Sequence, residues 1–206
     1  MSNRVTKYNH ILDLDLLSDN PVIIDAGANI GGYINEIKKL NVNPKKLIAL
    51  ECSKTNFRQL ESKNFEDVIL IEEALGGTEG VATFTEFIGS TKSDGTKKYH
   101  QWGNINGNFK SVLKNNAKTK EYSVSVTTLG KIMELYNIDV IDYLKMDIEG
   151  GEYDVINTIT EDLAKKIKQI SLETHNVNKN PSLIKKLKSL GYKVEEHNGL
   201  EIYAYR

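Results

Sequence analysis

The sequence predicts one α/β domain built on a mostly parallel sheet with helices on both faces. Three observations lead to this fold class. Short apolar runs alternate along the chain with segments whose apolar residues recur at helical spacing, which is typical of βαβ units and a doubly wound sheet. A glycine-rich turn over residues 27–32 follows the first buried run. Near the end of the chain, Asn198-Gly199 separates two strand-like runs, and this dipeptide favours a hairpin that places one antiparallel strand in the sheet.

Two kinds of segment alternate from residue 21 on. Strands are predicted where apolar residues form a short run or alternate with polar ones, over residues 21–26, 45–52, 67–75, 80–87, 122–129, 140–148 and 167–175, and then in the hairpin at 192–206. Helices are predicted where apolar residues share one face, as Tyr33, Ile34 and Ile37 do. Ser53 and Pro181 are favourable residues at helix starts. The predicted helices cover residues 31–40, 53–64, 129–136, 149–159 and 181–190.

Two segments fall outside this alternation. Residues 1–20 form a short amphipathic lead-in, and residues 88–120 are rich in Gly, Asn, Lys, Ser and Thr while containing Trp102 and Phe109. A loop this long inside a compact domain is often a lid or a binding loop. We therefore expect residues 88–120 to form part of the site for an acceptor substrate.

Composition restricts the class of protein. The chain has 206 residues, of which 39% are hydrophobic and 27% charged, which fits a globular protein with one core. It has three prolines and no Gly/Ser/Pro-rich linker, so we expect a single domain over residues 1–206. The formal net charge of −1 gives no overall attraction to nucleic acid or to an anionic membrane. Because Cys52 is the single cysteine, an internal disulfide and a multi-cysteine zinc site are excluded.

The sequence shows no signal for export or for membrane insertion. The leucines near the N-terminus are interrupted by acids, and no apolar stretch approaches the length of a membrane span. The expectation is a cytoplasmic protein.

Asp25, at the end of the first buried strand, decides between two kinds of cofactor. In an open α/β sheet, ligands bind beyond the carboxyl ends of the strands. A loop that binds pyrophosphate holds negative charge with backbone amides, and an acid at the strand tip would repel it. A ligand with an ammonium and a sulfonium group is attracted by the same acid, and S-adenosylmethionine is such a ligand. The spacing of Gly27 and Gly31 also differs from the G-x-G-x-x-G dinucleotide pattern.

Acids at the next two strand ends support this cofactor. Glu51 ends the second strand, 26 residues after Asp25, where a carboxylate accepts hydrogen bonds from ribose hydroxyls. Glu72 and Glu73 end the third strand, where an acid or a backbone group meets the adenine edge.

A second group of polar residues ends two later strands. Asp147 and Glu149 follow one of them, and Glu173 and His175 end the next. Side chains two residues apart on an extended chain face the same side. We therefore expect all four to project toward one cleft. By contrast, Glu152 and Asp154 are interpreted as acids that favour a helix dipole, and His10, His100 and His197 as surface histidines.

At these residues the sequence resembles the FkbM-type family of S-adenosylmethionine-dependent methyltransferases. The resemblance rests, in chain order, on "IIDAGANIGGY", "ALE" before a helix, "EEALGG", "VTTLGKI", "IDYLKMDIEGGEYDVI" and "LETH", and covers roughly residues 22–175. It implies a single-domain, seven-stranded Rossmann-like methyltransferase fold, mostly parallel, with an antiparallel C-terminal strand. It also implies methyl transfer to oxygen, typically on a sugar or natural-product hydroxyl.

The resemblance assigns residues to two motifs. The expected cofactor site consists of Asp25, Gly27, Ala28, Asn29, Gly31, Glu51, Cys52, Glu73 and Ala74. Asp147, Glu149 and Gly150 fall on the motif that faces the transferred methyl. One departure is Cys52, which stands where the family usually has proline after the glutamate; we interpret it as a tolerated change in loop rigidity.

An alcohol acceptor must lose a proton during methyl transfer, and two interpretations of the second group remain open. His175 or Asp147 is the general base, with Glu149 or Glu173 orienting it. Alternatively, Asp147, Glu173 and His175 hold Mg²⁺ or Mn²⁺, which lowers the pKa of the hydroxyl.

Three functions compete at this stage. The first is O-methylation of a hydroxyl on a sugar, a glycan or another small molecule. The second is methylation of nucleic acid, which predicts a basic cleft and salt-dependent binding. The third is a non-catalytic protein that binds a nucleotide cofactor.

Overall fold

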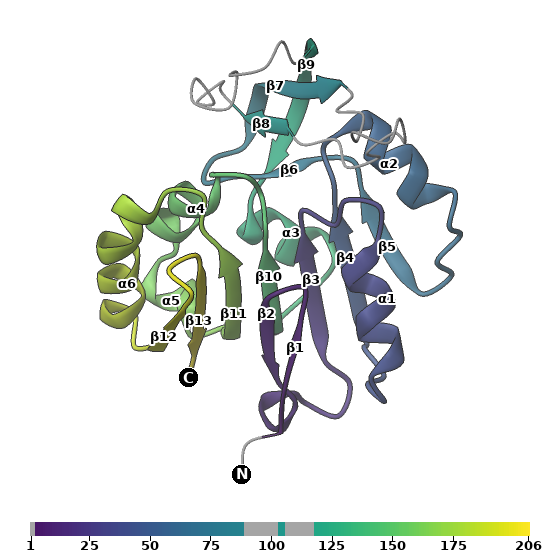
Figure 1. The fold of residues 1–206 in the computed structure, drawn as a ribbon. Coiled ribbons are helices and arrows are strands. Elements are labelled where there is room, and N and C mark those ends of the chain that lie inside the picture. The colour runs from purple at the N-terminus through teal and green to yellow at the C-terminus, as the bar shows by residue number, and fades with distance from the viewer. Residues whose placement is uncertain (1–2, 89–102, 106–117) are drawn as a thin grey trace.

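The computed structural model describes residues 3–88, 103–105 and 118–206. Its main feature is a seven-stranded sheet (Figure 1) with the order β12-β13-β11-β10-β3-β4-β5. The strands in this order are Lys193–His197, Glu201–Tyr205, Ile167–Glu173, Ile141–Met146, Val22–Ala26, Lys46–Leu50 and Val68–Ile71. β13 runs antiparallel to both of its neighbours, and the remaining pairs are parallel. The predicted fold class, including the antiparallel last strand, is confirmed.

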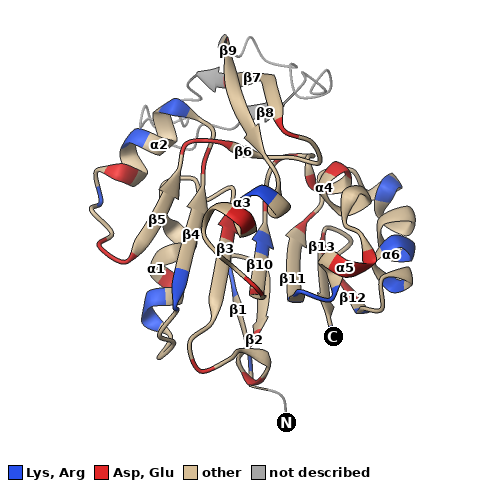
Figure 2. Cartoon of the chain, turned by 180° about the vertical axis from the view of Figure 1, so that it is seen from behind, with Lys and Arg blue, Asp and Glu red and all other residues tan. Residues whose placement is uncertain are grey.

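The central strands are buried on both faces, which explains their continuous apolar sequences. Ile23 lies in one core with helix α1 (Gly32–Lys39) and with Leu60 of helix α2 (Lys54–Glu61). Its neighbour Ile24 lies in the opposite core, which contains residues of four further helices. These are α3 (Leu129–Leu135), α4 (Glu152–Thr158), α5 (Glu161–Ala164) and α6 (Asn180–Ser189), which lie on the face turned toward the viewer in Figure 2.

The N-terminal segment is a hairpin, a structure that the expectation of a plain lead-in missed. β1 (Arg4–Lys7) and β2 (His10–Asp13) pair antiparallel and are followed by a 3₁₀ turn, η1 (Leu14–Leu16). The turn residues Tyr8 and Asn9 have φ of 49° and 66°, as a type I′ turn requires. Because neither turn residue is glycine, the sequence carried only a weak hairpin signal.

The hairpin is fixed to the main sheet by polar side chains of β11. Gln169 accepts from the Asp13 amide (2.9 Å) and donates to the Asp13 carbonyl (3.1 Å). The amide of Ile11 donates to Ser171 Oγ, and that oxygen also lies 3.2 Å from His10 Nδ1. His10 is therefore buried, at 1% exposure, and its interpretation as a surface histidine was wrong.

A smaller sheet stands beyond the carboxyl ends of the central strands (Figure 1). Its order is β6-β9-β7-β8, and its strands are Ala74–Leu75, Lys118–Thr127, Gly80–Ile88 and Gly103–Ile105. The strand predicted over 67–75 is thus divided between two sheets at Glu72 and Glu73. Periodicity identified β6, β7 and most of β9 but not β8, and it carried no information about which sheet each strand joins.

Most of the predicted acceptor loop lies outside the described residues, as do Trp102, Phe109 and His100. Within the range 88–120 the structure adds β8, which pairs antiparallel with β7. The role of this segment in acceptor binding stays a prediction.

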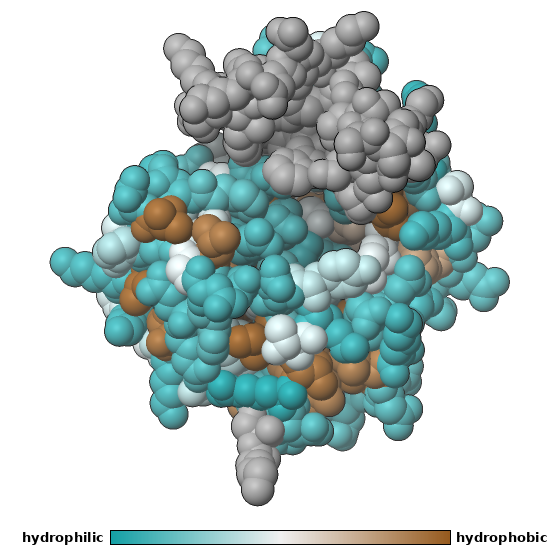
Figure 3. All heavy atoms as spheres, viewed as in Figure 1, coloured by the Kyte–Doolittle hydropathy of each residue, from teal (hydrophilic) through white to brown (hydrophobic). Residues whose placement is uncertain are grey.

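The described surface on the side of Figure 3 is mostly hydrophilic, with smaller apolar areas. None of the described helices has the length and apolar composition needed to cross a bilayer. The cytoplasmic location and the single-domain organisation stay predictions.

Candidate active site

The predicted functional residues gather at the carboxyl ends of β3, β4, β10 and β11, beneath the smaller sheet (Figure 1). Asp25 and Glu51 come from the first pair of strands, and Asp147 and Glu173 from the second. Since parallel strands end at the same edge of a sheet, two segments more than 100 residues apart in the sequence meet here.

The glycine loop is shaped by contacts within the protein. Gly27 and Gly31 adopt φ of +77° and +82°, in the left-handed region that favours glycine. A Cβ on Gly27 would lie 1.8 Å from the Asp147 carbonyl oxygen, and one on Gly31 would lie 2.8 Å from the Phe65 ring. The close approach at these two glycines is to the turn that follows β10 and to a core ring.

Asp25 is fully buried beneath this loop. The Nζ of Lys145, on the neighbouring strand β10, lies 3.0 Å from its Oδ1 and donates to the Gly27 carbonyl at 2.8 Å. Burial lowers the pKa of Lys145, but the charges of Asp25 and Asp147 raise it by more than burial lowers it. The pKa is therefore above its ordinary value, and the ammonium stays charged. The charge of Asp25 is thus already balanced inside the protein. Direct contact of Asp25 with a cofactor stays a prediction.

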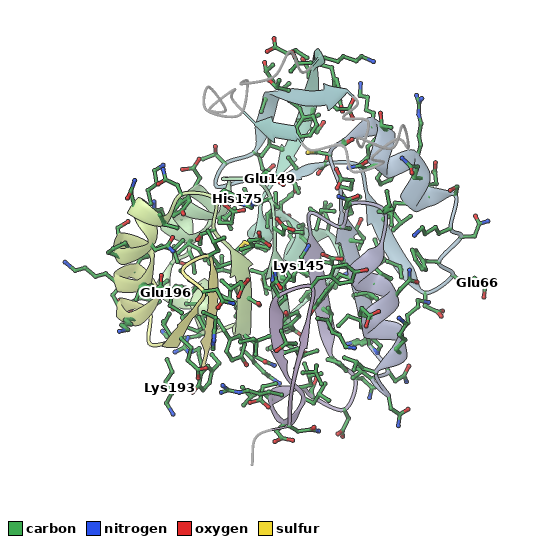
Figure 4. All side chains as sticks on the ribbon, viewed as in Figure 1. Glu66, Lys145, Glu149, His175, Lys193 and Glu196 are labelled. Carbon is green, nitrogen blue, oxygen red and sulfur yellow. The ribbon has the colours of Figure 1, made fainter. Side chains whose placement is uncertain are left out.

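Lys145 was missed by sequence reasoning. Its signal was a lysine in the middle of the apolar run "YLKMD", where burial requires an acidic partner. Figure 4 shows it deep in the central sheet, below Glu149 and His175.

Glu51 joins the ends of β3 and β4. Its two carboxylate oxygens accept the amides of Asn29 (2.8 Å) and Ser53 (2.7 Å). Asn29 has φ of 51°, and its Oδ1 accepts the amide of Ile30. Burial raises the pKa of Glu51 to about 7, although these two amides act in the opposite direction. The carboxylate is therefore held in one orientation at the edge where a ribose is expected.

The remaining predicted cofactor residues surround this position. Ala28 is buried in the core beside α1, and its amide donates to the Leu50 carbonyl. Cys52 is half-buried, packs beside the buried Ala74 of β6, and has a pKa raised by burial. Glu73 is half-buried just before β6. Their contact with a cofactor stays a prediction.

The structure brings the four predicted acid and histidine side chains together. His175 Nε2 lies 3.2 Å from Glu149 Oε2 and 3.7 Å from Asp147 Oδ1. Figure 4 shows Glu149 and His175 side by side. Glu173 joins through Asp147, because their carboxylates lie within 4.8 Å of each other. The four side chains therefore lie close together, while the cleft that they were expected to line and their chemical roles stay predictions.

The protonation states of this cluster depend on one another. Burial lowers the pKa of His175, but Glu152, Glu149 and Asp147 outweigh it, and the pKa rises to about 9. Burial raises the pKa of Glu149 to about 7, with His175 opposing. Burial and the charge of Asp147 also raise the pKa of Glu173. At neutral pH the imidazole is therefore mostly a cation between carboxylates.

The family follows from comparison with known proteins. The family model described as "Methyltransferase FkbM domain" matches residues 25–194, which is most of the chain. The chain belongs to this family. The predicted family is thereby confirmed.

The relatives of this FkbM domain are distant. Methyltransferase sdnD of Sordaria araneosa is 26% identical over 196 residues, covering 81% of this chain and 71% of the relative. Methyltransferase 1 of Beauveria bassiana is 25% identical over 158 residues, covering 73% and 63%. The crystal structure of Methyltransferase FkbM from Methylobacillus flagellatus superposes with a TM-score of 0.62 at 14% identity, covering 97% of this chain and 47% of the other. This last likeness shows the shared fold, and the chain spans about half of that protein.

Two buried residues enter the site without having been predicted. Glu152, interpreted as a helix-dipole acid, is fully buried, and its Oε1 lies 3.3 Å from His175 Nδ1. His10, from the hairpin before the family match, has a ring nitrogen within 4.8 Å of the Asp147 and Glu173 carboxylates. Burial, followed by the charge of Lys145, lowers the pKa of His10 well below its usual value. Its imidazole is therefore neutral, unlike that of His175.

The predicted metal ligands do not fit Mg²⁺ or Mn²⁺ well. The predicted set of Asp147, Glu173 and His175 is divided between two groups of described residues whose ligand atoms lie within 4.8 Å of one another. These groups are Asp147, Glu149 and His175, and His10, Asp147 and Glu173. Binding of a metal would require His175 to release a proton that the neighbouring carboxylates stabilise on the ring. Mg²⁺ also prefers oxygen ligands in octahedral geometry. We derive no step through a metal ion.

The raised pKa of His175 predicts a fall in stability at alkaline pH. Its ordinary value is 6.5 and its value in the fold is about 9, so its contribution is fully present below pH 6.5 and is lost as the pH rises through 9. The loss is at most about 3 kcal/mol. Urea unfolding between pH 8 and 9.5 measures the part of this loss that lies above the range in which Glu149 and Glu51, each with a pKa of about 7, titrate. An equal pH dependence in wild type and His175→Gln would contradict this assignment.

Proposed function

We propose that this chain binds S-adenosylmethionine and transfers its methyl group to a hydroxyl oxygen of a sugar, a glycan or another small molecule. One observation carries the proposal. Gly27 packs so closely on the backbone of Asp147 that a Cβ would lie 1.8 Å from its carbonyl oxygen. This contact supports a single site in which the loop assigned to the cofactor adjoins the acid–histidine cluster.

The cofactor side of the site suits a nucleoside with a cationic end. Each oxygen of Glu51 accepts one backbone amide and keeps capacity for a ribose hydroxyl. Asp147, Glu149 and Glu173 provide negative charge near the edge of the sheet, and Figure 2 shows acidic residues where the two sheets meet. This charge attracts a sulfonium and opposes a pyrophosphate.

His175 is the proposed general base. S-adenosylmethionine supplies a methyl group on a sulfonium leaving group, so the protein's main tasks are to orient the acceptor and to remove its proton. The Nε2 of His175 faces Asp147 and Glu149, which stabilise the imidazolium after proton transfer. A positive charge bound beside the ring lowers its pKa toward neutrality, because like charges repel.

Calorimetry and a consumption assay test the proposed function. We expect the protein to bind S-adenosylhomocysteine and to show no binding of NAD. With S-adenosylmethionine and a panel of sugars, lipids and oligonucleotides, we expect turnover with a hydroxylated small molecule or glycan. Turnover restricted to oligonucleotides would instead indicate a nucleic-acid methyltransferase. Binding of S-adenosylhomocysteine without turnover on any acceptor would indicate a non-catalytic binding protein.

Glu51→Ala is expected to weaken S-adenosylhomocysteine binding by about 10- to 100-fold, because charge-assisted hydrogen bonds to the ribose are lost. Calorimetry measures the affinity, and thermal unfolding shows whether the variant is folded. Glu66→Ala is the control, since Glu66 is exposed and lies away from the site in Figure 4. Unchanged affinity in a folded Glu51→Ala variant would remove Glu51 from the ribose site.

A further inference from the structure

The carboxylate of Glu152 fixes the turn that follows β10. Glu152 is the first residue of α4 and has no exposed surface. Its Oε1 accepts the amide of Ile148 at 2.9 Å, and its Oε2 accepts the amide of Gly150 at 3.0 Å. Asp147 and Glu149 flank Ile148 in this turn, and Glu149 adopts a left-handed φ of 56°. One buried side chain thus supports the backbone from which both cluster acids project.

The same carboxylate also faces the imidazole of His175. Oε1 of Glu152 lies 3.3 Å from Nδ1, while Nε2 faces Glu149 at 3.2 Å and Asp147 at 3.7 Å. The ring therefore has an acid at each nitrogen, and the acid at Nδ1 is the fully buried one. A histidine held in this way directs Nε2 toward Asp147 and Glu149, and a buried carboxylate beside Nδ1 orients a general base in the same manner.

We propose that Glu152 is a positioning residue, whose buried carboxylate joins the Asp147–Glu149 turn to His175 and directs Nε2 toward the cluster. The inference rests on the proposed function, because orienting a base has a purpose only if His175 removes a proton. It assigns to Glu152 a task that a helix-dipole acid does not perform.

Asp154 separates these two roles. It lies in the same first turn of α4 as Glu152 but is exposed. A favourable interaction with the helix dipole is shared by both acids. Contact with His175 and with the turn amides belongs to Glu152. Asp154→Asn is therefore the matched control for Glu152→Gln, since each change removes one charge and keeps the side-chain volume.

The test is a pH titration of the imidazole by long-range ¹H–¹⁵N NMR, with His175→Gln used to assign the signal. In the wild-type protein we expect both ring nitrogens of His175 to be protonated at pH 7.5. In Glu152→Gln we expect its titration midpoint to fall by at least about one pH unit, because the acid at Nδ1 is gone. In Asp154→Asn we expect the midpoint to stay within about 0.3 unit.

Two results would overturn the proposal. One is an equal shift of the midpoint in Glu152→Gln and Asp154→Asn, which would indicate a general field effect. The other is a wild-type midpoint near 6.5, the ordinary value, a result that does not depend on Glu152→Gln and so stands even if that variant does not fold. The titration uses no cofactor or acceptor. Failure of the proposed function appears separately, as absent S-adenosylhomocysteine binding.

Discussion

Replacing His175 by alanine is expected to lower the rate of methyl transfer by about 100-fold or more, with S-adenosylhomocysteine affinity within about twofold of wild type. The imidazole lies between Asp147 and Glu149 on one side and Glu152 on the other. Removal of the ring takes away the proposed base and leaves the acceptor hydroxyl without the group that accepts its proton. The rate is measured as release of S-adenosylhomocysteine with the acceptor that the panel identifies.

His197→Ala is the control for this prediction. His197 pairs with Glu195 at 3.6 Å, on the strand β12 at the edge of the sheet, and belongs to neither described group of possible ligands. We expect its substitution to leave the rate unchanged. A His175→Ala variant with wild-type turnover would rule out His175 as the base and leave Asp147 as the candidate.

The pH dependence of the rate gives a second check on the same residue. In the free protein the imidazole becomes neutral only near pH 9, so kcat/KM is expected to rise with pH up to this region. The corresponding limb in kcat lies at lower pH, because a bound sulfonium repels the imidazolium. In His175→Ala we expect neither kcat/KM nor kcat to show this rise with pH.

Replacing Gly27 by alanine is expected to destabilise the fold by about 3 kcal/mol and to weaken S-adenosylhomocysteine binding by more than about tenfold. The new Cβ would lie 1.8 Å from the carbonyl oxygen of Asp147 and 2.8 Å from its carbonyl carbon. Both atoms are backbone, so the loop and the turn must move apart. Urea unfolding and calorimetry measure the two effects.

Gly199→Ala is the matched control. Gly199 has a similar φ of +72°, but a Cβ there meets nothing within 4 Å. Its substitution therefore isolates the cost of the left-handed backbone, about 1 kcal/mol. Equal destabilisation in the two variants would show that the contact between Gly27 and Asp147 contributes nothing beyond backbone strain.

The sequence was most informative where local pattern and local structure coincide. Continuous apolar runs predicted the buried parallel strands because both of their faces lie in a core. Asn198-Gly199 predicted the closing hairpin, and both residues adopt the positive φ that such a turn needs. The sequence also placed Asp147 and Glu149 close together, and both face His175. The two-residue period of a strand is not the reason, because β10 ends at Met146 and Glu149 lies in the following turn with a left-handed φ of 56°.

Contacts between distant segments could not be predicted in this way. The partner of Asp25 is Lys145, 120 residues later, on a strand whose position beside β3 follows from the order of the sheet. His10 enters the site because a hairpin with no glycine in its turn docks on Gln169 and Ser171. In each case the neighbour comes from another strand, and the periodicity of a sequence does not tell which strands lie side by side.

By itself, then, the sequence determined the alternating α/β architecture, the glycine turns at residues 27–32 and 198–199, and the acids that line one edge of the sheet. The architecture follows from the spacing of apolar side chains, and the turns follow from the backbone freedom of glycine. The acids share one edge because parallel strands have their carboxyl ends at the same edge of a sheet. Tertiary structure alone decided that Asp25 is neutralised internally, that Glu152 faces His175, and that the strand pattern after Ile71 continues in a second sheet. These depend on which elements meet in space, and burial then sets the charge that each group carries.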